Sequence, residues 1–318
     1  MIRVICLNPV VDRVYYIDRF GAGSQYKEIA PQVFAGGKGV NTARVISQLG
    51  ETCCLYCFLG GANGRLVEED MRRHGVELHP FYLPAETRTT VNIIDRALGR
   101  ETEITEPSVP VGRREQEAFL QALEADLCPG DLVVCSGIPM AGMEPEVYKL
   151  VSELAARRGA LCALDANSQY LQASFPGRYC FAKPNAAELR ELFDEPFGED
   201  EVQTRRLARR MAGLGVERVL VSTGRTGGVL VHGELCLRAQ VPDLPIRSTI
   251  GSGDATVAGF CVGLVRGLDD ARALRLAMAC GVCNALFSQV GYVEKERVEE
   301  LMESIRLEPV PCDLEEVG

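Results

Sequence analysis

Residues 248–260 read STIGSGDATVAGF, a glycine-rich turn that runs directly into an apolar segment. We expect a helix to begin near Asp254. Glycines on either side of Ser252 let backbone N–H groups converge on one point, and the N-terminus of the following helix adds a partial positive charge. The segment therefore predicts an anion site, made by Gly251, Ser252 and Gly253, that suits a phosphoryl group in transfer.

Asp254 falls in the first turn of this expected helix. A carboxylate there can act as a base, or it can simply stabilise the positive end of the helix, and the segment alone leaves both roles open. The turn is not a Walker A loop, because nothing here fits G-x-x-x-x-G-K-[ST]. The other GGKG run, at 36–39, lacks both the leading glycine and the final Ser or Thr.

A second glycine-rich segment, residues 34–50, reads FAGGKGVNTARVISQLG. Its glycines permit a ligand to approach the backbone closely, and Lys38 supplies a point charge. Asn41 stands at the start of an expected helix with the apolar stripe Val45, Ile46 and Leu49. Asn41 could therefore bind a ligand, or it could be only an N-cap.

Short apolar runs alternate with amphipathic segments along most of the chain. The runs at 3–7, 53–59, 132–136, 161–165, 179–182 and 218–222 are continuous, which is typical of strands buried on both faces of a parallel sheet. Helical patterns fill 113–125, 145–158 and 200–214, and glycine follows the last two. This order predicts a doubly wound, mostly parallel α/β sheet flanked by helices, in one domain over 1–318.

Residues 10–34 and 87–105 break this pattern, because they contain alternating segments, such as 14–17 and 90–94, with no helix between them. Alternation leaves one face covered and one solvated, so we expect a small antiparallel sheet beside the main one. It can serve as a lid over the active site, as an edge extension or dimer surface, or as both. A second subunit is the expected cover for its apolar face, which predicts a homodimer through the lid.

The composition excludes several kinds of partner. With 34 basic and 44 acidic side chains, the formal net charge is −10, which argues against nucleic acid and anionic membranes. No targeting signal or apolar run of membrane-spanning length is found, so we expect a cytoplasmic protein. Two C-x-x-C pairs, Cys54/Cys57 and Cys280/Cys283, occur among 13 cysteines, but the chain has only 3 histidines. We interpret these cysteines as buried, reduced thiols rather than zinc ligands or a redox pair.

The two glycine-rich segments together resemble the two signatures of the phosphofructokinase B, or ribokinase-like, family of carbohydrate kinases. Four further segments agree in the family's order and look similar to its 1-phosphofructokinase and tagatose-6-phosphate kinase branch: LNPVVD at 7–12, TRT at 87–89, KPNAAE at 183–188 and STGRTGG at 222–228. The resemblance covers nearly the full chain. It implies a ribokinase-like α/β core with a small β lid, and phosphorylation of a sugar by ATP.

The resemblance also implies roles for single residues on the sugar side. Asp254 would take the proton from the attacking sugar hydroxyl, while the N–H groups of residues 251–253 stabilise the transferred phosphoryl group. The sugar would contact Asp12, Gly37, Lys38, Asn41, Arg88 and Ser136. The planar fork of Arg88 suits a phosphate held by two hydrogen bonds, and Lys27 is a further candidate for that phosphate, from the same or a partner subunit.

On the nucleotide side, ATP would lie near Lys183, Ser222, Gly224 and Gly227. Asn284 would lie near the adenine, although its pattern fits a helix-surface asparagine equally well. Mg²⁺ would be organised by Asn185 and Glu188 through water, since this cation keeps much of its hydration. Periodicity alone would instead make Glu188 a solvated residue in the first turn of a helix.

We therefore expect a ketohexose monophosphate to be converted to the bisphosphate by MgATP. Fructose 1-phosphate is preferred over tagatose 6-phosphate, because TRTTVN at 87–92 and STIGSGDAT at 248–256 look closer to 1-phosphofructokinases. One departure is SGIPM at 136–140, where the family more often reads SGSLP. The alternatives are a nucleoside or unphosphorylated-sugar kinase, which Lys38 with Arg88 disfavours, and a catalytically silent sugar-phosphate sensor, which Asp254 and the intact glycine loop disfavour.

Overall fold

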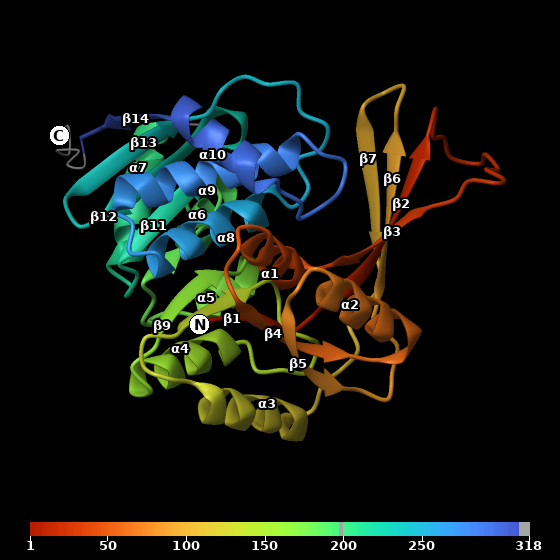
Figure 1. Ribbon diagram of the computed structural model, residues 1–318, viewed down its shortest axis with the longest axis horizontal. Coiled ribbons are helices and arrows are strands. Elements are labelled where there is room, and N and C mark those ends of the chain that lie inside the picture. The colour runs from red at the N-terminus through yellow and green to blue at the C-terminus, as the bar shows by residue number, and fades with distance from the viewer. Residues whose placement is uncertain (197–199, 312–318) are drawn as a thin grey trace.

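The computed structural model describes residues 1–196 and 200–311 as a large twisted sheet between two layers of helices, with a small second sheet to one side (Figure 1). Within the described residues the large sheet has the strand order β14-β13-β12-β11-β10-β9-β8-β1-β4-β5. From β5 to β11 all pairs are parallel, and β12, β13 and β14 extend one edge in antiparallel fashion. The strands are β1 (Ile2–Cys6), β4 (Cys53–Leu59), β5 (Glu77–Tyr82), β8 (Leu132–Ser136), β9 (Leu161–Asp165), β10 (Phe181–Ala182), β11 (Arg218–Ser222), β12 (Gly227–His232), β13 (Leu235–Gln240) and β14 (Arg306–Pro309).

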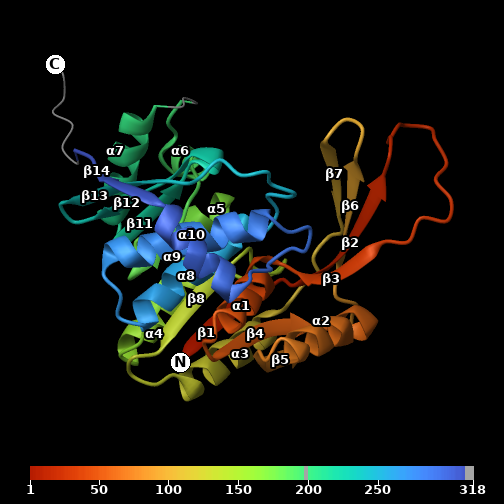
Figure 2. The same ribbon diagram turned by 45° about the horizontal axis from the view of Figure 1, so that its top comes forward.

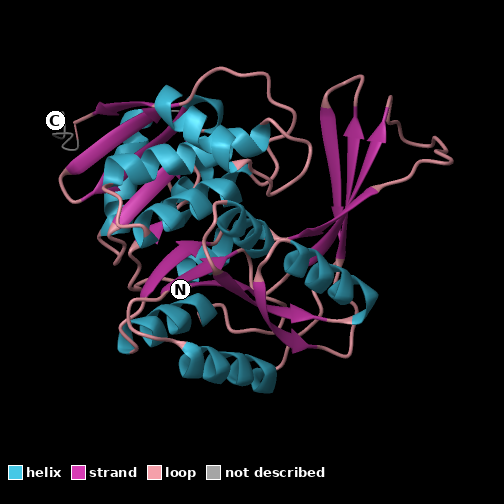
Figure 3. Ribbon diagram, viewed as in Figure 1, coloured by secondary structure: helices cyan, strands magenta, loops and turns pink. Residues whose placement is uncertain are grey.

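The helices cover both faces of this sheet, as its continuous apolar strands require (Figure 3). One face packs against α1 (Lys38–Gln48), α2 (Gly61–Arg73), α8 (Ser252–Val265), α9 (Asp270–Ala285) and α10 (Lys295–Ser304). The other packs against α3 (Arg113–Asp126), α4 (Val147–Arg157), α5 (Ser168–Ala173), α6 (Ala186–Phe193) and α7 (Glu201–Ala212). The predicted doubly wound α/β fold is therefore confirmed.

Most predicted elements agree with the structure to within two or three residues. The strand expected at 179–182 is shortened to Phe181–Ala182, with an isolated bridge from Tyr179 to Val216, and the helix expected near Asp254 begins two residues earlier. That helix, α8, begins at Ser252, because Gly251 in the left-handed region (φ 76°) serves as its N-cap. Asp254 and the glycine before it therefore both lie in the first turn.

The small sheet consists of β2 (Val10–Ile17), β3 (Gln32–Gly36), β6 (Thr89–Asp95) and β7 (Arg100–Thr105), in the order β3-β2-β6-β7. It stands away from the body beside α1 and α2 in both views (Figure 2). The expectation of an antiparallel sheet is wrong for its central pair, because β2 and β6 are parallel. They continue from β1 and β5, which point the same way in the large sheet, so both enter the small sheet in one direction.

The cysteines that the structure describes are free, and all of them except Cys128 are buried. Cys54 and Cys57 of β4 belong to the cores on opposite faces of the sheet, as their odd spacing in a strand predicts. Cys280 and Cys283 are both buried in the core beneath α9. Across the described ranges, no helix combines the length and the apolar character needed to cross a membrane.

Candidate active site

A cavity of about 510 Å³ lies where the small sheet meets the carboxyl ends of β1, β8 and β9. In parallel α/β sheets this edge is the usual place for a ligand. Most of the predicted sugar-binding and catalytic residues line it: Asp12, Gly37, Lys38, Asn41, Arg88, Ser136, Gly251 and Asp254. Lys27 is not among the described residues of this lining, and lies instead on the exposed loop between β2 and β3.

Asp254 points into this cavity from the first turn of α8 and is only 7% exposed. Its Oδ2 accepts a 2.9 Å hydrogen bond from Nδ2 of Asn41. Burial, together with the negative charge of Asp165, raises the pKa of Asp254 to about 6, although Lys38 and the Asn41 hydrogen bond act in the opposite direction. A carboxylate with this pKa is ionised at neutral pH and is still basic enough to accept a proton.

Asn41 is fixed in this orientation by Arg44, a buried arginine on the same helix. Nη1 of Arg44 donates to Oδ1 of Asn41 at 3.1 Å, and Nη2 donates to Oδ2 of Asp70 at 2.8 Å. Because Oδ1 of Asn41 is engaged as an acceptor, its NH₂ group must face Asp254. Asn41 is not an N-cap, because α1 begins three residues earlier, at Lys38.

Lys38 and Lys183 share one carboxylate, that of Asp165 at the end of β9. The Nζ atoms of the two lysines lie 3.3 and 3.7 Å from Oδ1 of Asp165. Burial alone would raise the pKa of Asp165, but the two ammonium groups hold it below its ordinary value. Burial also opposes the charge of Lys38, yet the surrounding carboxylates raise the pKa of this lysine, so the site holds a fixed pair of cations and an anion.

Arg88 immediately precedes β6 and is half-buried at the stem of the small sheet, not exposed on a lid strand. Its Nη2 lies 3.5 Å from the carbonyl oxygen of Asn8, and its buried Nε has no partner among the described residues. Burial lowers its pKa. Buried polar groups are normally satisfied, so an arginine left in this state beside a cavity is suited to an anionic ligand.

A second cavity, of about 370 Å³, lies on the other side of the α8 N-terminus. Its polar lining includes Ser222, Gly224 and Gly227, as predicted, together with Ser252 and Gly253 of α8. Its apolar lining comes from Val241, Leu244, Ile246, Met278 and Val282, which suits a planar base. Lys183 lies beside this helix end, because a Cβ atom on Gly253 would be only 3.4 Å from its Nζ.

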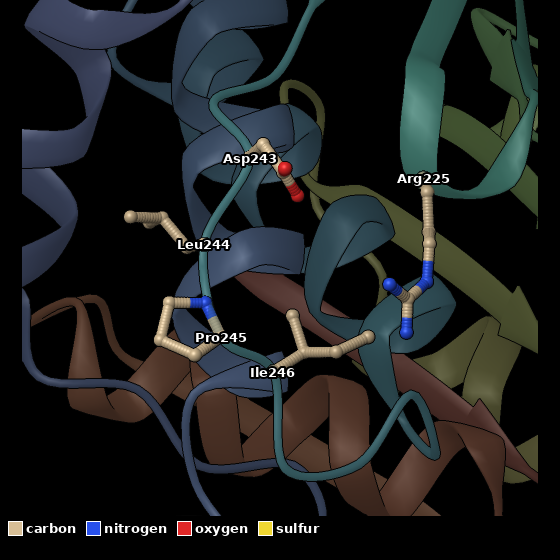
Figure 4. A pocket seen from close by; sticks show the side chains of 5 residues that line it. All are labelled: Arg225, Asp243, Leu244, Pro245 and Ile246. Carbon is tan, nitrogen blue, oxygen red and sulfur yellow. The ribbon is translucent and has the colours of Figure 1, made fainter.

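The outer mouth of this second cavity widens into a hollow of about 410 Å³ beside the segment that leads from β13 to α8. Figure 4 shows the guanidinium of Arg225 on one side of this hollow and Asp243 with its neighbours on the other. Arg225 belongs to the single 3₁₀ turn at Gly224–Thr226. The mouth therefore places a cation next to the glycines predicted to line the ATP pocket.

Asn284 is buried on α9 rather than exposed on a helix surface, and it is not among the described residues that line the second cavity. It is 1% exposed on α9, and its Nδ2 donates to the carbonyl oxygen of Ile250 at 2.8 Å and to Oγ of Ser252 at 3.1 Å. Its Oδ1 accepts from the N–H of Tyr292 at 3.2 Å. Asn284 thus braces the glycine turn that begins α8.

Asn185 and Glu188 form a capping box at the start of α6, in which each side chain accepts a 2.8 Å hydrogen bond from the backbone N–H of the other. No group of three or more His, Cys, Asp or Glu residues in the described chain is arranged to hold a metal unaided. Mg²⁺ bound with a nucleotide needs only one or two carboxylates, because phosphate oxygens and water complete its shell. Glu188, which is close enough to raise the pKa of Lys38, fits that requirement.

Two cavities that meet at a helix N-terminus, with a basic carboxylate in one and an apolar slot in the other, define a phosphotransferase site. The chain belongs to the pfkB family of carbohydrate kinases, whose model matches residues 4–295. It is similar to a tagatose-6-phosphate kinase of Staphylococcus epidermidis, with 30% identity over 96% of this chain and 99% of that protein. Its fold is also that of phosphofructokinase-2 from Escherichia coli solved with fructose-6-phosphate, at a TM-score of 0.87, 23% identity and coverage of 95% and 98% of the two chains.

Proposed function

We propose that this carbohydrate kinase transfers the γ-phosphoryl group of ATP to a hydroxyl of a ketohexose monophosphate. The observation that carries the proposal is the position of the α8 N-terminus between the two cavities. Asp254 lines the cavity that contains Arg88, whereas Ser252 and Gly253 line the cavity with the apolar slot. A sugar hydroxyl at Asp254 and a nucleotide phosphate at the glycine turn would then meet at one point.

Asp254 acts as the general base in this proposal. The carboxylate accepts the proton of the sugar hydroxyl, while Asn41 holds it in place and keeps it ionised near neutral pH. The N–H group of Ser252 donates to the carbonyl oxygen of Thr249 at 3.2 Å, whereas those of Gly253 and Asp254 have no acceptor among the described residues, so these two are available to the oxygens of the transferred group. Lys183, beside Gly253, adds a positive charge at the same point.

Arg88 supplies the argument that the sugar already carries a phosphate. Its half-buried guanidinium forms no ion pair within the described chain, and its Nε lacks a partner, so a bound anion would satisfy it. Lys38, by contrast, is paired with Asp165 and lies close enough to Asp254 for that carboxylate to raise its pKa. We therefore assign Lys38 to the point of phosphoryl transfer rather than to the phosphate that the sugar already carries.

Mg²⁺ enters the site with ATP, and when bound it neutralises charge on the phosphate oxygens. Glu188 and Asn185 would hold it through water, consistent with their place at the α6 N-terminus. Ser222, Gly224 and Gly227 would line the ATP pocket. Asn284 would act on the nucleotide only through the glycine turn that it braces.

Fructose 1-phosphate is the first candidate substrate, because the segments at 87–92 and 248–256 look closer to 1-phosphofructokinases. Tagatose 6-phosphate is the second, since the curated relative with 30% identity is a tagatose-6-phosphate kinase. Both sugars carry their phosphate and their free primary hydroxyl at opposite ends of the chain of carbons. Both therefore fit a cavity with a phosphate-binding arginine and a separate base.

A coupled assay of ADP release tests this function over fructose 1-phosphate, tagatose 6-phosphate, fructose 6-phosphate, fructose, ribose and adenosine. Each charge-assisted contact to the resident phosphate is worth about tenfold to more than a hundredfold in kcat/KM, so the phosphorylated sugars should exceed the others clearly. ATP without sugar is the blank, and Asp254→Asn is the control for the site. Comparable turnover of ribose or adenosine would overturn the assignment.

We also propose that the small sheet acts as a lid and joins two subunits in a homodimer. Because strand alternation sends Glu103 and Thr105 to the cavity, Ile104 between them points to the opposite face, where it is 57% exposed. Val33, which is 39% exposed, lies on that face too, three strand pairings away through Val91 and Arg13. A second copy would cover this face, and only then could Lys27 reach the sugar phosphate of a partner subunit.

A further inference from the structure

The cavity side of the small sheet carries a strip of hydrogen-bonding side chains that phosphoryl transfer does not require. Asp12 of β2 pairs with Thr90 of β6, and Thr90 pairs with Thr105 of β7. One step further along the strands, Asn92 pairs with Glu103. Laterally paired residues share one face of a sheet, and all five line the cavity.

Two groups in this strip lack hydrogen-bond donors. Asn92 is 4% exposed, and its buried Oδ1 accepts no hydrogen bond from the described residues. Glu103 is exposed, like the rest of β7; it accepts one hydrogen bond, at 3.1 Å, from Oγ1 of Thr105 to its Oε1, and no described residue donates to its Oε2. Since native proteins satisfy nearly all buried polar groups, the open acceptor of Asn92 indicates a ligand that donates hydrogen bonds.

The electrostatic environment places Glu103 within the cavity. After burial, the charge of Glu103 is the largest cause that raises the pKa of Asp12, to about 6, and Asp254 contributes to the same shift. Glu103 also acts on Arg88. Asp12 and Glu103 both act on Arg88, and along β6 the row of Asn92 and Glu103 lies one step farther from Arg88 than the row of Thr90 and Asp12.

This distribution of charge discriminates between kinds of ligand atom. The neighbouring carboxylates of Asp12 and Glu103 repel an anionic group, so the strip is unsuited to phosphate oxygens. Neutral hydroxyl groups, in contrast, can donate to carboxylate and amide oxygens. The strip fits the polyol middle of a sugar whose phosphate lies at Arg88 and whose acceptor hydroxyl lies at Asp254.

We propose that Glu103, assisted by Asn92, binds a ring hydroxyl of the sugar and so determines which sugar is accepted. The inference rests on the proposed function, because it takes a ketohexose monophosphate as the substrate. Tagatose and fructose differ at C4, so a contact with the C4 hydroxyl would distinguish their 6-phosphates. A contact with the C3 hydroxyl would instead distinguish ketoses that differ at that carbon.

The test compares Glu103→Ala and Glu103→Gln with the matched variants Glu101→Ala and Glu101→Gln. Glu101 lies two residues earlier on the same face of β7 and is exposed, as Glu103 is, but it is not among the described residues that line the cavity, so its loss changes the same charge on the same strand. The dissociation constant for each sugar phosphate is measured by titration calorimetry without ATP, and KM for ATP and the melting temperature are measured separately.

Glu103→Ala should weaken binding of the preferred sugar phosphate by about tenfold to a hundredfold, the usual cost of losing a hydrogen bond to a charged group. Glu103→Gln should weaken it less, because the amide oxygen still accepts. The ratio of affinities for tagatose 6-phosphate and fructose 6-phosphate should move towards one. KM for ATP, the melting temperature and both Glu101 variants should stay close to wild type.

Equal affinities in Glu103→Ala and Glu101→Ala would overturn the inference, as would a large fall in melting temperature for Glu103→Ala. A deoxy analogue adds a check, since removal of the C4 or C3 hydroxyl should weaken binding to wild type and cause no further loss in Glu103→Ala. If wild type binds no ketohexose monophosphate, the proposed function fails by itself. The same four variants are then compared on the sugar of the panel that wild type binds best.

Discussion

Nδ2 of Asn41 donates a 2.9 Å hydrogen bond to Oδ2 of Asp254, although 213 positions separate these residues in the chain. The bond joins the N-terminal turns of α1 and α8, the two segments that follow the glycine-rich runs. In the proposed function, this contact would couple binding of the sugar to activation of its hydroxyl. The first three predictions concern this contact and the charges around it.

Asp254→Asn should lower kcat by roughly 10²–10⁴, because the amide keeps the shape of the side chain but cannot accept the proton. KM for ATP should change little, since Asp254 lines the cavity in which the sugar, and not ATP, is proposed to bind. Steady-state kinetics with both substrates varied would measure this. A variant with nearly wild-type kcat would reduce Asp254 to a residue that stabilises the helix end.

The pH profile of kcat should fall on the acid side with a midpoint at about 6, because Asp254 has a pKa of about 6 and must be ionised to act as a base. Asn41→Ala removes a hydrogen bond that lowers this pKa. Its acid limb should therefore move to higher pH. An unchanged midpoint in Asn41→Ala would show that the hydrogen bond does not control the ionisation of the base.

Asp165→Asn should move the same limb in the opposite direction. The charge of Asp165 raises the pKa of Asp254, so its removal lowers that pKa and leaves Lys38 and Lys183 without a shared counter-charge. We expect kcat at pH 7 to decrease as well, because the two ammonium groups lose their anchor. A shift to higher pH, as in Asn41→Ala, would contradict this reading of the charge cluster.

Arg88→Ala should raise KM for the sugar phosphate by about tenfold to several-hundredfold, and Arg88→Lys should recover only part of the loss because an ammonium lacks the planar fork. KM for ATP should move far less. The melting temperature without ligand should stay the same or rise, because the variant removes a half-buried cation that forms no ion pair in the described chain. A parallel rise in both KM values would make Arg88 a structural residue.

Light scattering at micromolar concentration should return a homodimer, and Ile104→Glu should convert it to a monomer by placing a charge on the outer face of the small sheet. Val265→Glu is the matched control, since Val265 is 43% exposed at the end of α8, a helix that covers the large sheet. A monomeric wild type would remove the dimer proposal and the role of Lys27 across subunits. Dissociation by Val265→Glu alone would place the interface elsewhere.

The pattern of apolar and polar residues in the sequence was sufficient to predict the main part of the fold. Continuous apolar runs located β4, β8, β9 and β11, because strands buried on both faces consist mainly of apolar side chains. The parallel pairing of β2 with β6 was not predictable from alternation, which reports that one face is covered but not the direction of the neighbouring strand. That direction follows from β1 and β5, and so from the tertiary arrangement.

The same distinction applies to the site. Residues within recognisable segments, such as Asp254 and Asn41, lie together in one cavity, so the sequence was sufficient to group them. Asp165 was missed, although an aspartate that ends a buried strand at the carboxyl edge of a parallel sheet is a usable signal. Glu103 and Asn92 carried no local signal, because only the register of β6 and β7 brings them together. Asn284 was misplaced since helical periodicity cannot show what packs on a helix.

The small sheet and the large sheet divide the substrates between them. The residues proposed to recognise the sugar hydroxyls, Asp12, Asn92 and Glu103, lie on the four short strands, whereas the apolar slot and the glycine turn belong to the large domain. The sugar specificity of such an enzyme can therefore change during evolution while its catalytic residues stay the same. An engineer can do the same, by grafting strands 10–17, 32–36, 89–95 and 100–105 as one exchangeable cassette.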